Sequence, residues 1–421
     1  MTTSLAQAHL SVLRTALQQP CPPWTSGIVN VRREDLTLFY GDERPAKLNF
    51  ADATEEQLQG LAGACQPATF GLGTEDVLDE GYRKAGKLDC SDFAAALDIG
   101  SLEILDAVVP DLWEGAAIRA ELYKLNVYGP GSFFKSHKDT PRSGNMVGSL
   151  VLVLPTQHQG GQLSLSHGPH SSAFDSATLL AGKHSSIAYV ALFSDVTHAV
   201  EPVVSGFRVT LTYNLFVSGS KSLPPRQPSE AEVVCQRALT ALLADAAFLP
   251  RGGLLGFGLE HEYPVPRTVS DPNTLSQVRR VLKGADARIE RAASRAGLKT
   301  ELKLAYTTKG DEYYDSGKGV RIALDSVVDL RDIDSAGSGE IDEVIRRAGQ
   351  AVVRTTAGGK QAWTKLYEEE QLVSVCWVTE PEEEKNRAES AYIAMGNEPV
   401  LEYAYGRAVL LVEIPRVEGR V

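Results

Sequence analysis

Five short β-rich runs in the middle of the chain constrain its fold more than any other feature of the sequence. They are rich in apolar and β-branched residues, and turn-forming residues separate most of them. The runs are Ile118–Tyr128, Met146–Leu154, Gln162–Ser166, Ser185–Leu192 and Phe207–Phe216. So many strands within one stretch of sequence favour a β-sandwich or a β-barrel.

The sequence before these runs has a different character. Three of its stretches carry apolar residues at helical spacing, namely Ser4–Gln18, Thr54–Ala64 and Ser91–Ala107. We therefore expect residues 1–112 to form an N-terminal helical support region and residues 113–216 to form the β-rich core. The expected fold class is α+β, with a β-rich core and flanking helices.

Residues 229–421 are expected to form a further α+β region of unknown role. Ser229 and Glu232 have the spacing of a capping box at the start of a helix, and a second helix is expected over Asn273–Ala296, ended by Gly297. Strand-like runs follow at Leu302–Thr307, Gly319–Val327, Leu372–Val378 and Ala408–Ile414. Before this region, Val217–Pro228 contains three prolines and reads as a linker.

Length and charge exclude several classes of protein. A chain of 421 residues exceeds the size at which one core usually stops growing, so one large decorated domain or two domains are expected. The net charge of −12 argues against a surface built to bind phosphate backbones or anionic membranes. The five cysteines lie singly, and no signal-peptide core or long apolar run occurs, so we expect an intracellular protein of the cytoplasm or nucleus.

A His-x-Asp pair between the first two β-rich runs predicts a metal site. His137 and Asp139 share one face of an extended strand, because alternate residues point the same way. His198 can supply a third ligand from a later strand. Two histidines and one carboxylate, with other coordination positions open, form the ligand set of non-heme Fe(II) oxygenases. His-x-Asp alone is common, and the alternative is a set of unrelated surface histidines.

Arg208, ten residues after His198 and at the start of a β-rich run, strengthens the prediction of an iron site. Its guanidinium could hold a dicarboxylate through a bidentate pair.

Together these residues resemble the 2-oxoglutarate and Fe(II)-dependent dioxygenase superfamily, in particular its prolyl 4-hydroxylase-like branch. The resemblance covers residues 118–216. It implies a double-stranded β-helix, or jelly roll, with Fe(II) at its mouth. It also implies 2-oxoglutarate and O2 as co-substrates, with Arg208 binding the distal carboxylate of 2-oxoglutarate.

Three further residues are expected to contact the co-substrate. Asn126-x-Tyr128 resembles an element of AlkB-type enzymes in which both side chains touch the co-substrate. Thr210 shares a strand face with Arg208 and could add a hydroxyl. Prolyl hydroxylases often present a tyrosine from the strand after His-x-Asp, whereas the run here is Ser149–Leu154. Tyr123 or Tyr128 could replace that contact, or no residue does.

For other residues of this region the sequence predicts structural or supporting roles. Gly160 and Gly161 are expected to form a tight turn into a strand. Asp195 could support a metal ligand or a substrate, or cap a loop. The remaining histidines of the region lie in loop-like sequence and are expected at the surface: His158, His167, His170 and His184.

The resemblance implies hydroxylation of a substrate C–H bond with release of succinate and CO2. No separate catalytic acid, base or nucleophile is expected beyond the iron centre. A prolyl or other protein side chain is the first substrate hypothesis, and a small molecule is also open. An AlkB-like nucleic-acid demethylase is the alternative that Asn126-x-Tyr128 suggests, although the acidic composition counts against it. A non-catalytic binding module on the same scaffold is the alternative from another class.

Overall fold

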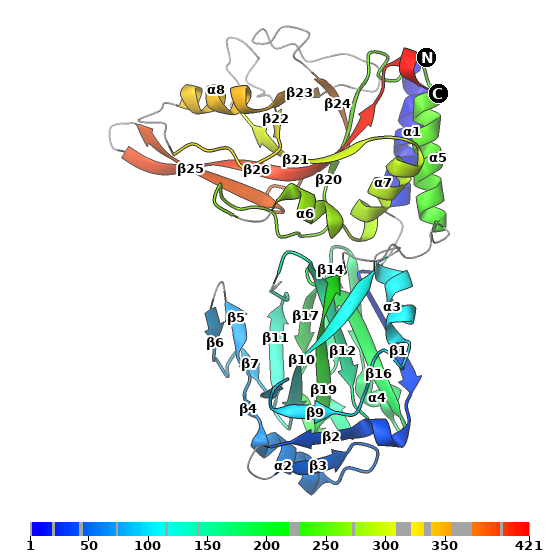
Figure 1. The fold of residues 1–421 in the computed structure, drawn as a ribbon, viewed down its shortest axis with the longest axis vertical. Helices are drawn as coiled ribbons and strands as arrows, with labels where there is room; N and C mark the ends of the chain where they lie inside the picture. The colour runs from blue at the N-terminus through cyan, green and yellow to red at the C-terminus, as the bar shows by residue number, and fades with distance from the viewer. Residues whose placement is uncertain are drawn as a thin grey trace. The chain divides into compact units, whose positions relative to one another are not determined.

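A computed structural model describes most of the chain, and it divides into two compact units. The described residues are 2–18, 22–41, 45–72, 75–113, 117–140, 143–218, 228–271, 274–308, 321–331, 338–354, 373–395 and 399–420. Pro22–Arg226 forms the first compact unit, here called the core unit. Met1–Cys21 and Gln227–Val421 form the second, here called the C-terminal unit (Figure 1).

The core unit is built on a seven-stranded antiparallel sheet. In spatial order its strands are β1 (Trp24–Asn30), β16 (Ser186–Phe193), β12 (Met146–Val153), β19 (Arg208–Val217), β10 (Ile118–Tyr128), β8 (Gly86–Asp89) and β4 (Gln66–Pro67). A second sheet of five strands contains β15 (His170–Phe174), β14 (Leu163–His167), β17 (Thr197–Val200), β11 (Phe133–His137) and β7 (Arg83–Lys84). All five predicted strand runs are therefore confirmed.

The central strand β19 is buried on both faces, and its alternation separates an apolar core from a polar cavity. Val209, Leu211 and Leu215 are at most 1% exposed and pack in the core. The even-numbered residues at the start of the same strand line a cavity: Arg208, Thr210, Thr212 and Asn214. Three helices pack against strands of this sheet: α2 (Glu55–Ala64), α3 (Ile104–Leu112) and α4 (Ser176–Leu180). Because successive side chains of a strand point to opposite faces, the alternation of apolar and polar residues in β19 decides which side chains face the cavity.

The helices predicted at Ser4–Gln18 and Thr54–Ala64 are confirmed, but the helical prediction is wrong over most of the rest of residues 1–112. Ser91–Ala107 is not one helix, because Phe93–Ala95 is strand β9 and helix α3 begins only at Ile104. Additional strands lie at β2 (Thr37–Tyr40), β3 (Ala46–Asn49), β5 (Phe70–Leu72) and β6 (Glu75–Val77). Several strands from this segment extend the two sheets of the core unit, so tertiary pairing overrode the local helical pattern.

The C-terminal unit is α+β and contains a closed six-stranded barrel. The strands follow one another as β20 (Gly253–Gly258), β24 (Val373–Thr379), β23 (Gln350–Arg354), β22 (Arg321–Leu324), β21 (Thr300–Thr307) and β26 (Pro399–Ile414). The ring closes because β26 also pairs with β20. Seven buried side chains form one hydrophobic cluster of this barrel: Ala305, Ala323, Val352, Val375, Trp377, Val409 and Leu411. β25 (Arg387–Met395) continues beyond the barrel as a hairpin with β26 (Figure 1).

The helices of this unit follow the sequence signals with two differences. Ser229 Oγ accepts a hydrogen bond from the Glu232 amide at the start of α5 (Glu230–Ala244), but the Glu232 carboxylate pairs with Arg291 and Arg295. The predicted helix Asn273–Ala296 is two helices, α6 (Leu275–Arg280) and α7 (Gly284–Arg295), and Gly297 ends the second at a φ of 74°.

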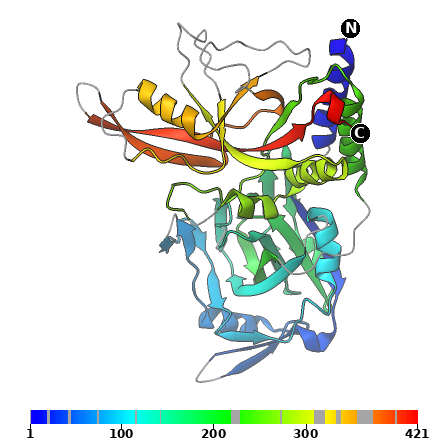
Figure 2. The ribbon, with the colours of Figure 1, turned by 45° about the horizontal axis from the view of Figure 1, so that its top comes forward.

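Two more helices complete the unit. They are α1 (Thr2–Leu17), which lies beside α5, and α8 (Ser338–Ala348) (Figure 2). Most of the predicted linker, residues 219–227, lies outside the described residues. Within the described part of the chain, no helix has the length and apolar character needed to cross a membrane.

Candidate metal centre

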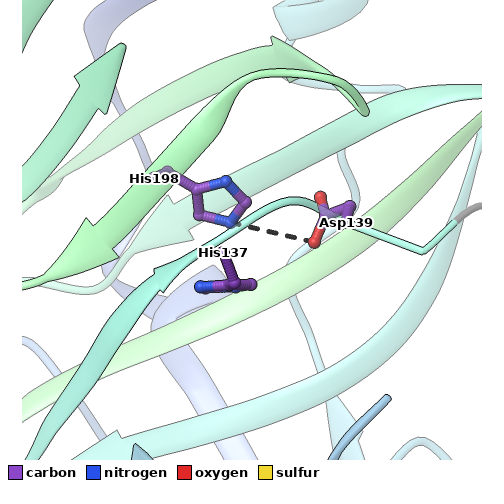
Figure 3. A group of neighbouring side chains, drawn as sticks. All are labelled: His137, Asp139 and His198. Carbon is purple, nitrogen blue, oxygen red and sulfur yellow. Dashed lines mark ion pairs between the residues drawn. The ribbon is translucent and has the colours of Figure 1, made fainter. Parts of the chain in front are cut away.

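Three side chains predicted as metal ligands come together in the core unit. His137 in β11 and His198 in β17 are directly opposite each other in paired strands, and Asp139 lies in the loop after β11. Each residue offers one ligand atom, and these atoms all lie within 4.8 Å of one another (Figure 3). His198 Nε2 is 3.8 Å from Asp139 Oδ1. The three residues could therefore hold one metal ion between them.

Hydrogen bonds fix the orientation of all three side chains. His137 Nδ1 is 2.8 Å from the Lys135 carbonyl oxygen, and His198 Nδ1 is 3.0 Å from that of Val196. Because a carbonyl can only accept, each Nδ1 must carry the proton, which leaves both Nε2 lone pairs available to a metal. Ser149 Oγ donates to Asp139 Oδ2 at 2.5 Å, which leaves Oδ1 on the side of His198.

The protonation state of His137 suits a ligand. Burial, with a further contribution from neighbouring His198, lowers the pKa of His137 from its ordinary 6.5 to about 4. The imidazole is therefore neutral at neutral pH. Two imidazoles and one carboxylate on one side of a site match the donor set expected for Fe(II) in oxygenases, so these residues fit that metal.

This lowered pKa gives a testable acid sensitivity of the metal-free protein. Between pH 6.5 and about pH 4 the unfolded chain binds the His137 proton more readily than the folded chain, so stability falls as the pH is lowered through this window. We expect His137 to account for up to about 3 kcal/mol of that loss. Urea unfolding at pH 7 and pH 4.5, with chelator present, should show a smaller loss in His137→Gln. Equal losses of unfolding free energy in the wild type and in His137→Gln would contradict the lowered pKa of His137.

The three residues open into a cavity of about 690 Å³ that both sheets of the core unit line. Arg208 lies in its wall and is 1% exposed. Its Nε and Nη2 atoms are buried without a hydrogen-bond partner, and no carboxylate among the described residues pairs with it. Burial lowers the pKa of Arg208. An unpaired buried guanidinium is costly, so the site is suited to a ligand that brings a carboxylate.

Gly161 gives Arg208 the space that it occupies. Its φ is +68°, and a Cβ there would lie 3.0 Å from Arg208 Cδ and 2.9 Å from Val203 Cγ2. The turn predicted at Gly160 and Gly161 is present, with positive φ at both residues. The glycine pair therefore also shapes the wall beside the guanidinium.

Gly161→Ala is expected to lower the free energy of unfolding by more than about 1 kcal/mol, because backbone strain adds to the collisions with Val203 and Arg208. Gly168→Ala is the matched control, since Gly168 also has positive φ but no atom lies within 4 Å of its added Cβ. Urea denaturation of both variants separates the two causes. An equal loss in both would show that the contacts with Val203 and Arg208 cost nothing.

The other predicted co-substrate residues all line the same cavity, but not all have free polar groups. Tyr128 pairs with Arg208 across neighbouring strands, and the guanidinium lies 5.6 Å from the centre of its ring. Thr210 is 1% exposed and faces the cavity two residues along. Asn126 differs, because Oδ1 accepts from Arg83 Nη2 at 2.8 Å and Nδ2 donates to Thr212 Oγ1 at 3.2 Å.

Several residues in the core unit differ from what the sequence predicts. Arg83, Lys124 and Phe134 are buried and line the cavity, yet none was singled out. His158 was expected at the surface, which is wrong, because it is buried with its ring nitrogens near Thr156 O and Ser176 Oγ. The loop-like sequence around His158 does not show that other parts of the chain enclose this side chain. Asp195, which was considered for metal or substrate support, pairs with His167 at 3.1 Å.

Comparison with known proteins agrees with this geometry. Residues 123–216 match the family model of the 2OG-Fe(II) oxygenase superfamily. The predicted resemblance is confirmed over these residues, and the family implies Fe(II), 2-oxoglutarate and O2. A search of curated proteins found no match.

Solved structures similar to the chain include two prolyl hydroxylases. One is a prolyl-4-hydroxylase from Pseudomonas putida, with 19% identity and a TM-score of 0.30, covering 50% of this chain and 100% of that chain. The other, from Trichoplax adhaerens, is in complex with a hypoxia inducible factor peptide fragment, with 17% identity and a TM-score of 0.30, covering 50% and 90%. Both TM-scores are below 0.5, so these two similarities carry no argument about the function of this chain.

Proposed function

We propose that this chain is an Fe(II)- and 2-oxoglutarate-dependent dioxygenase that hydroxylates a C–H bond of its substrate and releases succinate and CO2. The observation that carries the proposal is one cavity that contains both the His137, Asp139 and His198 cluster and the unpaired buried Arg208. We infer that the two antiparallel sheets of the core unit form the jelly-roll scaffold of this family.

Each cavity residue has a defined part in this proposal. Nε2 of His137 and of His198, with Asp139 Oδ1, would hold the iron, which supplies the oxidising chemistry together with O2. Arg208 would pair with the distal carboxylate of 2-oxoglutarate and so orient that molecule toward the cluster. Apolar wall residues, including Val151 and Leu163, would keep bulk water from the site.

For the substrate we retain a prolyl or other protein side chain as the first proposal, with a small molecule as the second. An AlkB-like demethylase has less support, since the Asn126 side chain that suggested it is already bonded to Arg83 and Thr212. The acidic composition also disfavours a nucleic-acid partner.

The proposal is tested by succinate formation from 2-oxoglutarate. The full chain, loaded with Fe(II) under anaerobic conditions and then exposed to air, should form succinate in a reaction that requires both iron and 2-oxoglutarate. Ascorbate is added to supply the two electrons that the unidentified substrate would otherwise provide. His137→Ala should lose this activity, whereas His184→Ala, which replaces an exposed histidine, should keep it. Undiminished turnover in His137→Ala would refute the assignment. A non-catalytic binding module would consume no 2-oxoglutarate at all.

A further inference from the structure

Arg83 is a buried residue of the cavity wall to which no role has yet been given. It lies in the two-residue strand β7, directly opposite Phe134 of β11, and is 6% exposed. Its Nη1 donates to the Thr69 carbonyl oxygen at 2.6 Å and its Nη2 donates to Asn126 Oδ1 at 2.8 Å. The guanidinium is thus held at two points by neutral acceptors.

The planar guanidinium also covers an aromatic ring that touches a metal ligand. Arg83 Cζ lies 4.4 Å from the centre of the Phe134 ring. The same ring stacks on the His137 imidazole, with 3.5 Å between ring centres and 21° between planes. The Phe134 ring therefore contacts both the Arg83 guanidinium and the His137 imidazole.

A strand irregularity makes this stack possible. Residues three apart in a regular strand point to opposite faces, so Phe134 and His137 would normally lie apart. In β11 the pairing with β17 shifts between these two residues, because Phe134 pairs with Val200 and His137 pairs with His198. β11 therefore has one more residue than β17 over this interval, an irregularity of the kind that redirects side chains beside functional sites. It turns the His137 ring onto Phe134.

Arg83 also connects this stack to the opposite wall of the cavity. Asn126, which accepts from Arg83, donates in turn to Thr212 on β19, the strand that begins with Arg208. One guanidinium therefore braces the metal-ligand side and the predicted co-substrate side at once.

We propose that Arg83 is a positioning residue that holds the His137 imidazole at its metal-binding angle by pressing on Phe134. This inference rests on the proposed metal site. Arginine suits the role because its planar fork can lie flat on a ring while donating along two directions, which a lysine ammonium cannot do. Residues that orient a metal ligand typically change metal affinity by about 10- to 100-fold when they are replaced.

The experiment measures binding of Co(II), a redox-stable substitute for Fe(II), by its ligand-field absorption. Arg83→Met, which keeps length and apolar bulk, should weaken Co(II) binding by about tenfold and alter the band shape. The Co(II) affinity of Arg83→Lys should lie between those of Arg83→Met and the wild type. Arg83→Lys replaces Arg83→Met in the test if Arg83→Met does not fold. Lys84→Met, an exposed neighbour in the same strand, is the matched control and should bind as the wild type does.

A double-mutant cycle with Phe134→Leu tests whether Arg83 affects Co(II) binding through its contact with Phe134. If Arg83 acts through Phe134, adding Arg83→Met to Phe134→Leu should cause little further loss of Co(II) affinity. Additive losses would overturn the proposal, as would a folded Arg83→Met with wild-type affinity and spectrum. Neither result would affect the proposed oxygenase function. A wild-type chain that binds no Co(II) would instead overturn both.

Discussion

Asp139→Asn is expected to weaken Fe(II) binding by more than about 100-fold and to abolish succinate formation. The amide has nearly the same size as the carboxylate but removes the one negative charge of the cluster. Replacing a residue that merely supports a metal ligand costs about 10- to 100-fold in affinity, so removing the only anionic ligand should cost more. Anaerobic titration with Fe(II) or Mn(II) measures the affinity directly.

Ser149→Ala is the matched control for this prediction. It removes the hydrogen bond of 2.5 Å to Asp139 Oδ2 but keeps the carboxylate. We expect a loss nearer to tenfold, because the ligand survives and only its orientation loosens. If Asp139→Asn and Ser149→Ala bound Fe(II) equally well, the carboxylate would not be a ligand and the cluster would need another explanation.

The strand runs and the closeness of His137 to Asp139 could be predicted from the sequence because both depend on local patterns. Alternation over Ile118–Tyr128 and Phe207–Phe216 marks strands wherever they pair. His-x-Asp places two ligand-type side chains close together in the sequence. The expectation that they share a strand face is wrong, because β11 ends at His137 and Asp139 lies in the loop that follows. The position of His198 opposite His137 was not visible in the sequence, since register between strands depends on the whole sheet.

The N-terminal segment shows where local patterns fail. Its short strands, such as Arg83–Lys84 and Gly86–Asp89, have little strand propensity of their own. They become strands because an exposed sheet edge offers backbone partners, which are contributed by residues far away in the chain. Arg83 was missed for the same reason, because nothing near it in sequence indicates that it will be buried against Phe134.

The hydrogen-bond partners of Asn126 and Arg208 explain why these two residues are expected to differ in their importance for co-substrate binding. Asn126 and Arg208 both line the cavity, and both were expected to contact the co-substrate. The Asn126 amide is bonded to Arg83 and Thr212, so a ligand would have to compete for it. Arg208 has two buried nitrogen atoms without partners, so it is the residue at which a carboxylate would gain most.

Arg208→Met is therefore expected to have opposite effects on the free protein and on ligand binding. Without ligand, the variant should be at least as stable as the wild type, because replacing a buried charge by an apolar side chain of similar volume is often neutral or stabilising by about 1–4 kcal/mol. With 2-oxoglutarate, the loss of a buried charge partner should cost about 2–5 kcal/mol of binding energy. That corresponds to a rise in KM of about 30-fold or more.

Thermal unfolding with and without 2-oxoglutarate separates these two effects in one experiment. In the wild type loaded with Mn(II), 2-oxoglutarate should raise the unfolding temperature, because a ligand that binds only the folded state stabilises it. In Arg208→Met the starting temperature should be equal or higher, but the rise should disappear. Arg208→Lys keeps the charge and loses the two-pronged geometry, so it should recover only part of the rise. A variant that was destabilised without ligand yet stabilised normally by 2-oxoglutarate would mean that Arg208 is a structural residue, and that the distal carboxylate is bound elsewhere in the cavity.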